Sequence, residues 1–104
     1  MLPINYQDEV WTSDGQRLGV AHHYYERPDE AQPDLLFYAA YVEVENFDLG
    51  MTYYIPTDFF AERGESSGRV TLTVPMKTVL NRTWTRRPEF VIRGLAQEQE
   101  LPAG

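Results

Sequence analysis

The stretch that decides the fold is Asp14-Gly15-Gln16-Arg17-Leu18-Gly19-Val20. Asp14 and Gly15 favour a tight turn, because glycine readily takes the positive φ that such turns require. A strand follows the turn, and Gly19 within it indicates a bend or the close approach of a neighbouring backbone. Later in the chain, Tyr53-Tyr54-Ile55 predicts another strand, which Pro56 ends because proline cannot donate to a β-ladder. Together these signals predict a small closed β-barrel.

Alternation of apolar residues predicts which strand faces point into the core. In residues 17–25 the expected core set is Leu18, Val20, His22 and Tyr24. In residues 69–74 it is Val70, Leu72 and Val74. Pro75 then suits the first turn of a short helix over residues 76–81. Five or six short strands with one such helix predict an all-β fold.

The longest apolar stretch, residues 35–44, has two faces of different character. Its expected inner set is Leu36, Tyr38, Ala40, Val42 and Val44. Its outer set, Leu35, Phe37, Ala39 and Tyr41, is too apolar for a solvated face. We therefore expect this outer face to be covered by the tail of the chain or by another chain.

Length and composition limit the classes of protein to consider. The chain has 104 residues, enough for one domain, and no cysteine, which excludes disulfides and thiolate chemistry. We expect a cytoplasmic protein, since the N-terminus lacks the basic and apolar regions of a signal peptide. A membrane span is not expected either, because no window approaches the roughly 20 apolar residues that a spanning helix needs.

The formal net charge of −7 is unevenly distributed. Residues 1–75 carry four basic and thirteen acidic residues, whereas residues 76–104 carry five basic and three acidic residues. Binding to a nucleic-acid backbone is disfavoured by this balance, because such binding depends on cationic side chains. The mildly basic C-terminal region is expected to fold back on the acidic body or to meet an acidic partner.

An ordered series of short motifs resembles the PRC-barrel family, in particular its small stand-alone bacterial members. The series is Trp11-x-x-Asp14-Gly15-x-x-Leu18-Gly19-Val20, then Tyr41-Val42-Glu43-Val44, Tyr53-Tyr54-Ile55-Pro56-Thr57-Asp58 and Val70-x-Leu72-x-Val74-Pro75-x-Lys77. The resemblance implies a six-stranded barrel, residues 1–80, with a short helix after its last strand. It also implies a role in recognition or assembly and brings no catalytic residues with it. We expect residues 81–104 to form a C-terminal extension, partly docked and frayed from residue 97. The chain departs from the family pattern in its Pro-rich loop, residues 27–34, and in the extension after Thr83.

Candidate catalytic and metal-ligating residues are few. His22 and His23 are neighbours on a predicted strand, so they are expected to point to opposite faces and not to bind one metal ion. Glu43 and Glu45 share one face and are expected to be solvated. The serines in turns have no recognisable base, and there is no phosphate-binding loop. We therefore expect no enzyme activity, no metal and no cofactor.

A protein interface is the function that the sequence favours. Arg82, Trp84, Arg86 and Arg87 combine residue types that dominate interface hot spots. With Phe37 and Tyr41 they give the expected interface of a homodimer, or of a complex with another protein. Two alternatives remain. The arginines and Trp84 are also typical of a module that binds RNA or the ribosome, and a small barrel can bind a small ligand or a metal.

Overall fold

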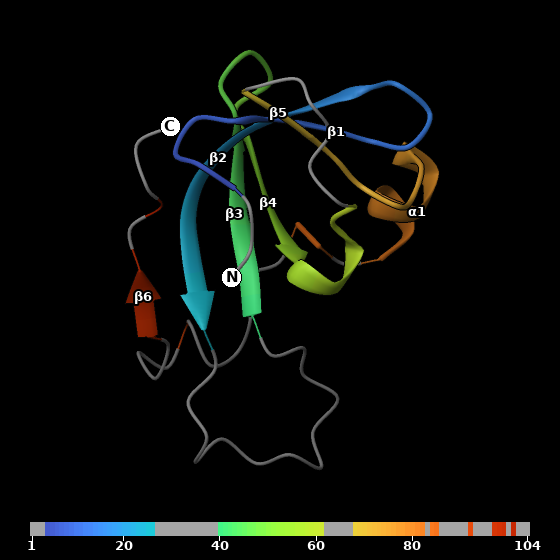
Figure 1. Cartoon of the computed structure of the whole chain (residues 1–104). Helices are drawn as coiled ribbons and strands as arrows, with labels where there is room; N and C mark the ends of the chain where they lie inside the picture. The colour runs from blue at the N-terminus through green and yellow to red at the C-terminus, as the bar shows by residue number, and fades with distance from the viewer. Residues whose placement is uncertain are drawn as a thin grey trace, which may run out of the picture.

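The computed structural model describes residues 4–26, 40–61, 68–82, 84, 85, 92, 97–99 and 101. They form a β-rich fold with one short α-helix, which confirms the predicted class in outline (Figure 1). In chain order the elements are β1 (Glu9–Trp11), β2 (Arg17–Glu26), β3 (Ala40–Asn46), β4 (Met51–Pro56), the 3-10 turn η1 (Thr57–Phe59), β5 (Arg69–Thr71), α1 (Met76–Asn81) and β6 (Gln97–Gln99).

The strands belong to one sheet, in the order β4-β3-β2-β1-β5. Neighbouring strands are antiparallel except β1 and β5, which run parallel. The ten-residue strand β2 is the longest and curves strongly, as Figure 1 shows. Along one edge β2 pairs with β3, and along the other it pairs first with β1 and then with β6. Strand β2 therefore organises the sheet.

The sheet is open, and the closed six-stranded barrel expected from the sequence is not shown. Among the described residues, no ladder joins the edge strands β4 and β5. A single bridge joins Phe60, in the segment after β4, to Leu72, in the segment after β5. Beside this bridge, Ala61 N donates to Thr71 O and Thr73 N donates to Phe59 O, both at 2.8 Å. The two edges are thus in contact at one end only.

The turn between β1 and β2 forms as the sequence predicts. Gly15 has φ +80°, and its N–H donates to Thr12 O at 3.1 Å. The Asp14 carboxylate accepts a hydrogen bond from the Thr12 hydroxyl and another, at 3.2 Å, from the backbone N–H of Met76. Asp14 therefore ties this turn to the first residue of α1, which begins after Pro75 as predicted.

Gly19 is required by the close approach of two backbones. A Cβ atom at this position would lie 2.8 Å from the carbonyl carbon of Glu45 and even closer to its oxygen. Real Cβ atoms do not approach backbone this closely, so only glycine fits without a shift of β2 or β3. This contact confirms the expected approach of a neighbouring backbone, and Pro56 ends β4 as expected.

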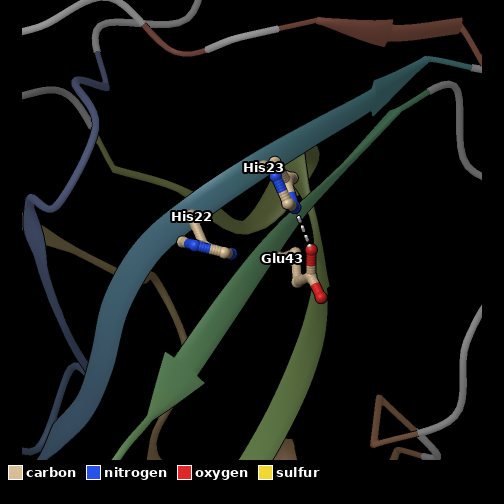
Figure 2. A group of neighbouring side chains, drawn as sticks. All are labelled: His22, His23 and Glu43. Carbon is tan, nitrogen blue, oxygen red and sulfur yellow. Dashed lines mark hydrogen bonds and ion pairs between the residues drawn. The ribbon is translucent and has the colours of Figure 1, made fainter.

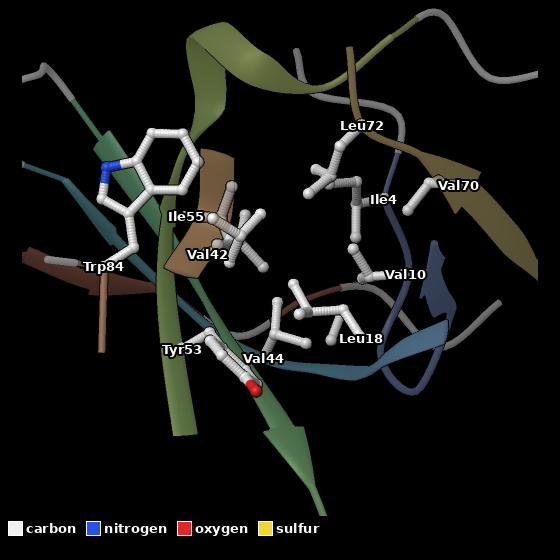
Figure 3. Close-up of a cluster of buried hydrophobic side chains, with 12 residues drawn as sticks. Ile4, Val10, Leu18, Val42, Val44, Tyr53, Ile55, Val70, Leu72 and Trp84 are labelled. Carbon is white, nitrogen blue, oxygen red and sulfur yellow. The ribbon is translucent and has the colours of Figure 1, made fainter. Parts of the chain in front are cut away.

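The hydrophobic core lies on the inner face of the curved sheet (Figure 3). It contains the predicted residues Leu18, Val42, Val44, Val70 and Leu72. Each of these side chains is at most 2 % exposed. Four more fully buried side chains complete its centre: Ile4, Val10, Ile55 and Val79.

The predicted inner face of β2 was wrong at Val20 and His22. Ala21 is fully buried in the core, whereas Val20 and His22 are only half-buried. Two irregularities cause the change, because Leu18 has no partner in the β1–β2 ladder and His22 has none in the β2–β3 ladder. Each extra residue is a β-bulge, which reverses the alternation of side chains that follow it. Tyr24 still packs against the core, as predicted.

Several described residues of the C-terminal region pack on the rest of the chain, among them Trp84 and Leu101, which contact the core. The expectation that the chain frays from residue 97 was wrong for Gln97–Gln99, which form β6 and pair with Tyr24–Glu26. Trp84 O accepts a hydrogen bond from Tyr54 N at 2.6 Å, on the free edge of β4. In the part of the chain described here, no helix has the length and apolar character needed to cross a bilayer.

Candidate functional site

The turn between β3 and β4 is held in place by one side chain, Asn46. Its Oδ1 accepts a hydrogen bond from Leu49 N at 3.0 Å, which is typical of the turns that asparagine stabilises. Its Nδ2 donates to Leu18 O at 3.1 Å, deep in the sheet. At the outer side, Arg17 contacts the Asp48 carboxylate at 3.6 Å. The turn is therefore anchored to β2 from both sides.

Three exposed apolar side chains lie on this turn and on the first residue of β4. Phe47 is 72 % exposed, Leu49 is 67 % exposed and Met51 is 37 % exposed. We call these three residues the hairpin tip. Turns are normally polar, so exposed apolar side chains at a turn are unusual. The sequence carries this signal in Phe47-Asp48-Leu49-Gly50-Met51, where apolar residues alternate through the turn.

The interface residues expected from the sequence lie in different places. Tyr41 and Trp84 are buried within the single chain, at 9 % and 6 % exposure. The Trp84 ring packs against Phe59, with their ring centroids 4.8 Å apart. Arg82 is exposed at the end of α1. Phe37, Arg86 and Arg87 lie outside the described residues, so their part in an interface stays a prediction.

A second group of side chains gathers where β2 bulges against β3. His23 pairs with Glu43 across the ladder, and the extra residue His22 precedes it. The bulge places both imidazoles on the outer face, together with the Glu43 carboxylate. One ligand atom from each of the three side chains lies within 4.8 Å of the others. We call His22, His23 and Glu43 the His–Glu cluster, and Figure 2 shows its arrangement.

Short polar contacts define the geometry of the His–Glu cluster. His23 Nδ1 lies 2.6 Å from Glu43 Oε2, the contact marked by the dashed line in Figure 2. The Tyr25 hydroxyl donates to the same oxygen at 3.3 Å. The two imidazole centroids are 4.3 Å apart, and the Tyr6 ring lies 5.7 Å from His22. Aromatic rings therefore border the carboxylate and both imidazoles.

Two sequence-based predictions about these residues were wrong. His22 and His23 do not point to opposite faces, because the bulge at His22 interrupts the alternation on which that prediction depended. Glu43 is not solvated but 6 % exposed. Glu45, on the same face two residues away, is half-buried and accepts a hydrogen bond from the Thr52 hydroxyl at 3.0 Å. The only signal in the sequence was the adjacency of the two histidines.

The comparisons with known proteins give no match. No protein-family model, no curated protein and no solved structure is similar to this chain. The resemblance to the PRC-barrel family therefore stays a prediction.

Proposed function

We propose that this chain is a non-catalytic protein-interaction module that acts as a homodimer. The observation that carries the proposal is the hairpin tip, where Phe47 and Leu49 are 72 % and 67 % exposed on a turn that Asn46 ties to β2 by a hydrogen bond. Aromatic and methionine side chains are enriched in the buried centres of interfaces. A turn tied in this way also loses less conformational entropy on binding.

A second copy of the chain is the partner that best suits this surface. Most soluble oligomers are symmetric dimers, in which one patch contacts itself across a two-fold axis. Association through sheet edges is less suitable here. At the outer edge of β4, Tyr54 N already donates a hydrogen bond to Trp84 O. The segment after β4 also pairs with the segment after β5, at Phe60 and Leu72. Among the described residues, the hairpin tip then offers neighbouring exposed apolar side chains on which two copies can pack.

The architecture that we propose for the module is a PRC-type barrel. The contact between Phe60 and Leu72 supports this, because it joins the two edges of the sheet at one end. The short helix Met76–Asn81 follows β5, as the family pattern implies. We propose the cytoplasm as its location, since a chain without cysteine depends on no oxidising compartment for its fold.

Sedimentation equilibrium of matched variants tests the proposed dimer. Phe47→Ser with Leu49→Ser removes apolar area from the tip without changing the net charge. Loss of an interface hot spot costs about 2 kcal/mol, which corresponds to a dissociation constant about thirtyfold weaker. Leu80→Ser is the control, because Leu80 is equally apolar and 61 % exposed but lies on α1.

The unmodified chain and the Leu80→Ser variant are expected to form dimers at high micromolar concentration, and the tip variant to be mainly monomeric. Circular dichroism checks that each variant is folded, which we expect since the substituted side chains are exposed. A monomeric unmodified chain would contradict the proposal, as would equal dimer affinity for the tip variant and the control.

A further inference from the structure

We infer that the His–Glu cluster, His22, His23 and Glu43, is a binding site for one divalent transition-metal ion, best matched to Zn²⁺. Two imidazoles and one carboxylate are the ligand types that zinc accepts. Their potential ligand atoms already lie within 4.8 Å of one another without any rearrangement of the backbone. This inference is independent of the proposed dimer, because it concerns a different set of side chains.

The unpartnered nitrogen of His22 is the first observation that points to a ligand. Among the described residues, His22 Nδ1 is buried and has no hydrogen-bond partner. A buried polar atom without a partner costs about 1–3 kcal/mol, so folded proteins contain few of them. A bound metal ion supplies the missing partner, because the neutral imidazole nitrogen donates its lone pair to the metal.

The burial of Glu43 is the second observation. Its residue is only 6 % exposed, and burial of a charged carboxylate is unfavourable unless partners compensate it. The Tyr25 hydroxyl and His23 both contact Oε2, so the carboxylate is held toward the histidines. Tyr25 lies outside the proposed ligand set, and a contact of this kind orients metal ligands in known sites and strengthens binding. A surface cluster of acidic groups has none of these features.

The distances require only a local adjustment on binding. Zinc lies about 2.0–2.2 Å from nitrogen and oxygen ligands, so two ligands of a tetrahedral site are roughly 3.4 Å apart. His23 Nδ1 and Glu43 Oε2 are closer than that, at 2.6 Å. The metal therefore replaces their direct hydrogen bond and moves the two groups slightly apart, while His22 turns within the bulge to complete the set.

The partial exposure of the site suits reversible binding of an ion. The His23 side chain is 34 % exposed and that of Glu43 is 8 % exposed, so solvent reaches one side of the cluster. Three protein ligands leave a fourth position for water, as in zinc sites that are not purely structural. The net charge of −7 also favours the approach of a cation.

Titration of the tag-free chain with Zn²⁺ and Co²⁺ tests the inference. Isothermal calorimetry is expected to give one ion per chain. Since the chain has only two histidines, ¹⁵N-histidine NMR gives one set of ring signals for each, and the ion is expected to shift both. These measurements need no variant. No binding at millimolar metal, or shifts confined to one histidine, would overturn the inference.

A matched pair of variants then tests the carboxylate. Glu43→Gln is expected to weaken Zn²⁺ binding at least about tenfold, because the amide is a poor replacement for a charged ligand. Glu45→Gln is the control, since it makes the same change on the same face two residues away. Circular dichroism establishes that both variants are folded. Equal affinities for the two folded variants would show that Glu43 is no ligand and would overturn the proposed set.

Discussion

The backbone of Gly19 in β2 lies directly against the backbone of Glu45 in β3, with no room for a Cβ atom between them. Gly19→Ala is therefore expected to lower the free energy of unfolding by about 1–3 kcal/mol, because the new methyl group must displace a strand. Chemical denaturation measures the change. Gly50→Asn is the control, since Gly50 has φ +65° with open space around it and asparagine tolerates that conformation. Equal small effects at both positions would contradict the close contact.

The carboxylate of Asp14 is expected to make the stability of the fold depend on pH in acid. Its hydrogen bond from the Thr12 hydroxyl, together with the weaker one from Met76 N, lowers the pKa of Asp14 below its usual value of 3.8. A group whose pKa is lower in the folded chain than in the unfolded chain stabilises the fold at pH values above the pKa of the unfolded chain. That contribution is lost as the pH falls through the folded pKa.

Asp14→Asn is therefore expected to lower stability at neutral pH and to reduce its decline below about pH 4. Thermal unfolding followed from pH 2 to pH 7 measures both effects. The unmodified chain is the reference for both effects. If the Asp14→Asn variant loses as much stability in acid as the unmodified chain does, the hydrogen bonds of Asp14 do not stabilise the fold.

Trp84 is expected to stabilise its own chain. Trp84→Ala removes a ring that is 6 % exposed and packed against Phe59, which costs about 3–5 kcal/mol of unfolding free energy. Leu80→Ala, four residues earlier and 61 % exposed, is expected to change stability by less than about 0.5 kcal/mol. Denaturation at low protein concentration separates this effect from any dimer. A small cost for Trp84→Ala would mean that the ring does not belong to the core.

Features that depend on neighbouring residues could be predicted from the sequence. Asp14 and Gly15 indicated the first turn, Pro75 indicated the start of the helix, and Val70 and Leu72 were correctly assigned to the core. Each of these depends on a local backbone preference or on uninterrupted alternation. Gly19 was also interpreted correctly, because a glycine inside a strand often lies where another backbone comes close.

The His–Glu cluster depends on a feature that alternation cannot reveal. A single extra residue in a ladder leaves no mark on composition, yet the bulge at His22 brings both imidazoles to the side of Glu43. The burial of Glu43 depends in the same way on contacts between strands. Pairing of Gln97–Gln99 with β2 was also beyond prediction, since a short polar strand carries no periodic signal.

Added salt is expected to strengthen the proposed dimer. Two copies that each carry a net charge of −7 repel one another, and salt screens this repulsion. Sedimentation at about 0.05 M and about 0.5 M salt is expected to show tighter association at the higher concentration. Binding of RNA would show the opposite dependence, because it is lost as salt rises. Dissociation of the dimer at high salt would show that ionic contacts, and not the apolar tip, hold it together.

The most direct measurement of the central claim is an isotope-filtered NOE experiment on a mixture of ¹³C-labelled and unlabelled chains. It detects contacts between copies and ignores those within one copy. If two copies pack through the hairpin tip, the side chains of Phe47 and Leu49 give intermolecular signals. The claim would be contradicted if the intermolecular signals came from other residues. It would also be contradicted if the mixture gave no intermolecular signals at the concentration where dimers should form.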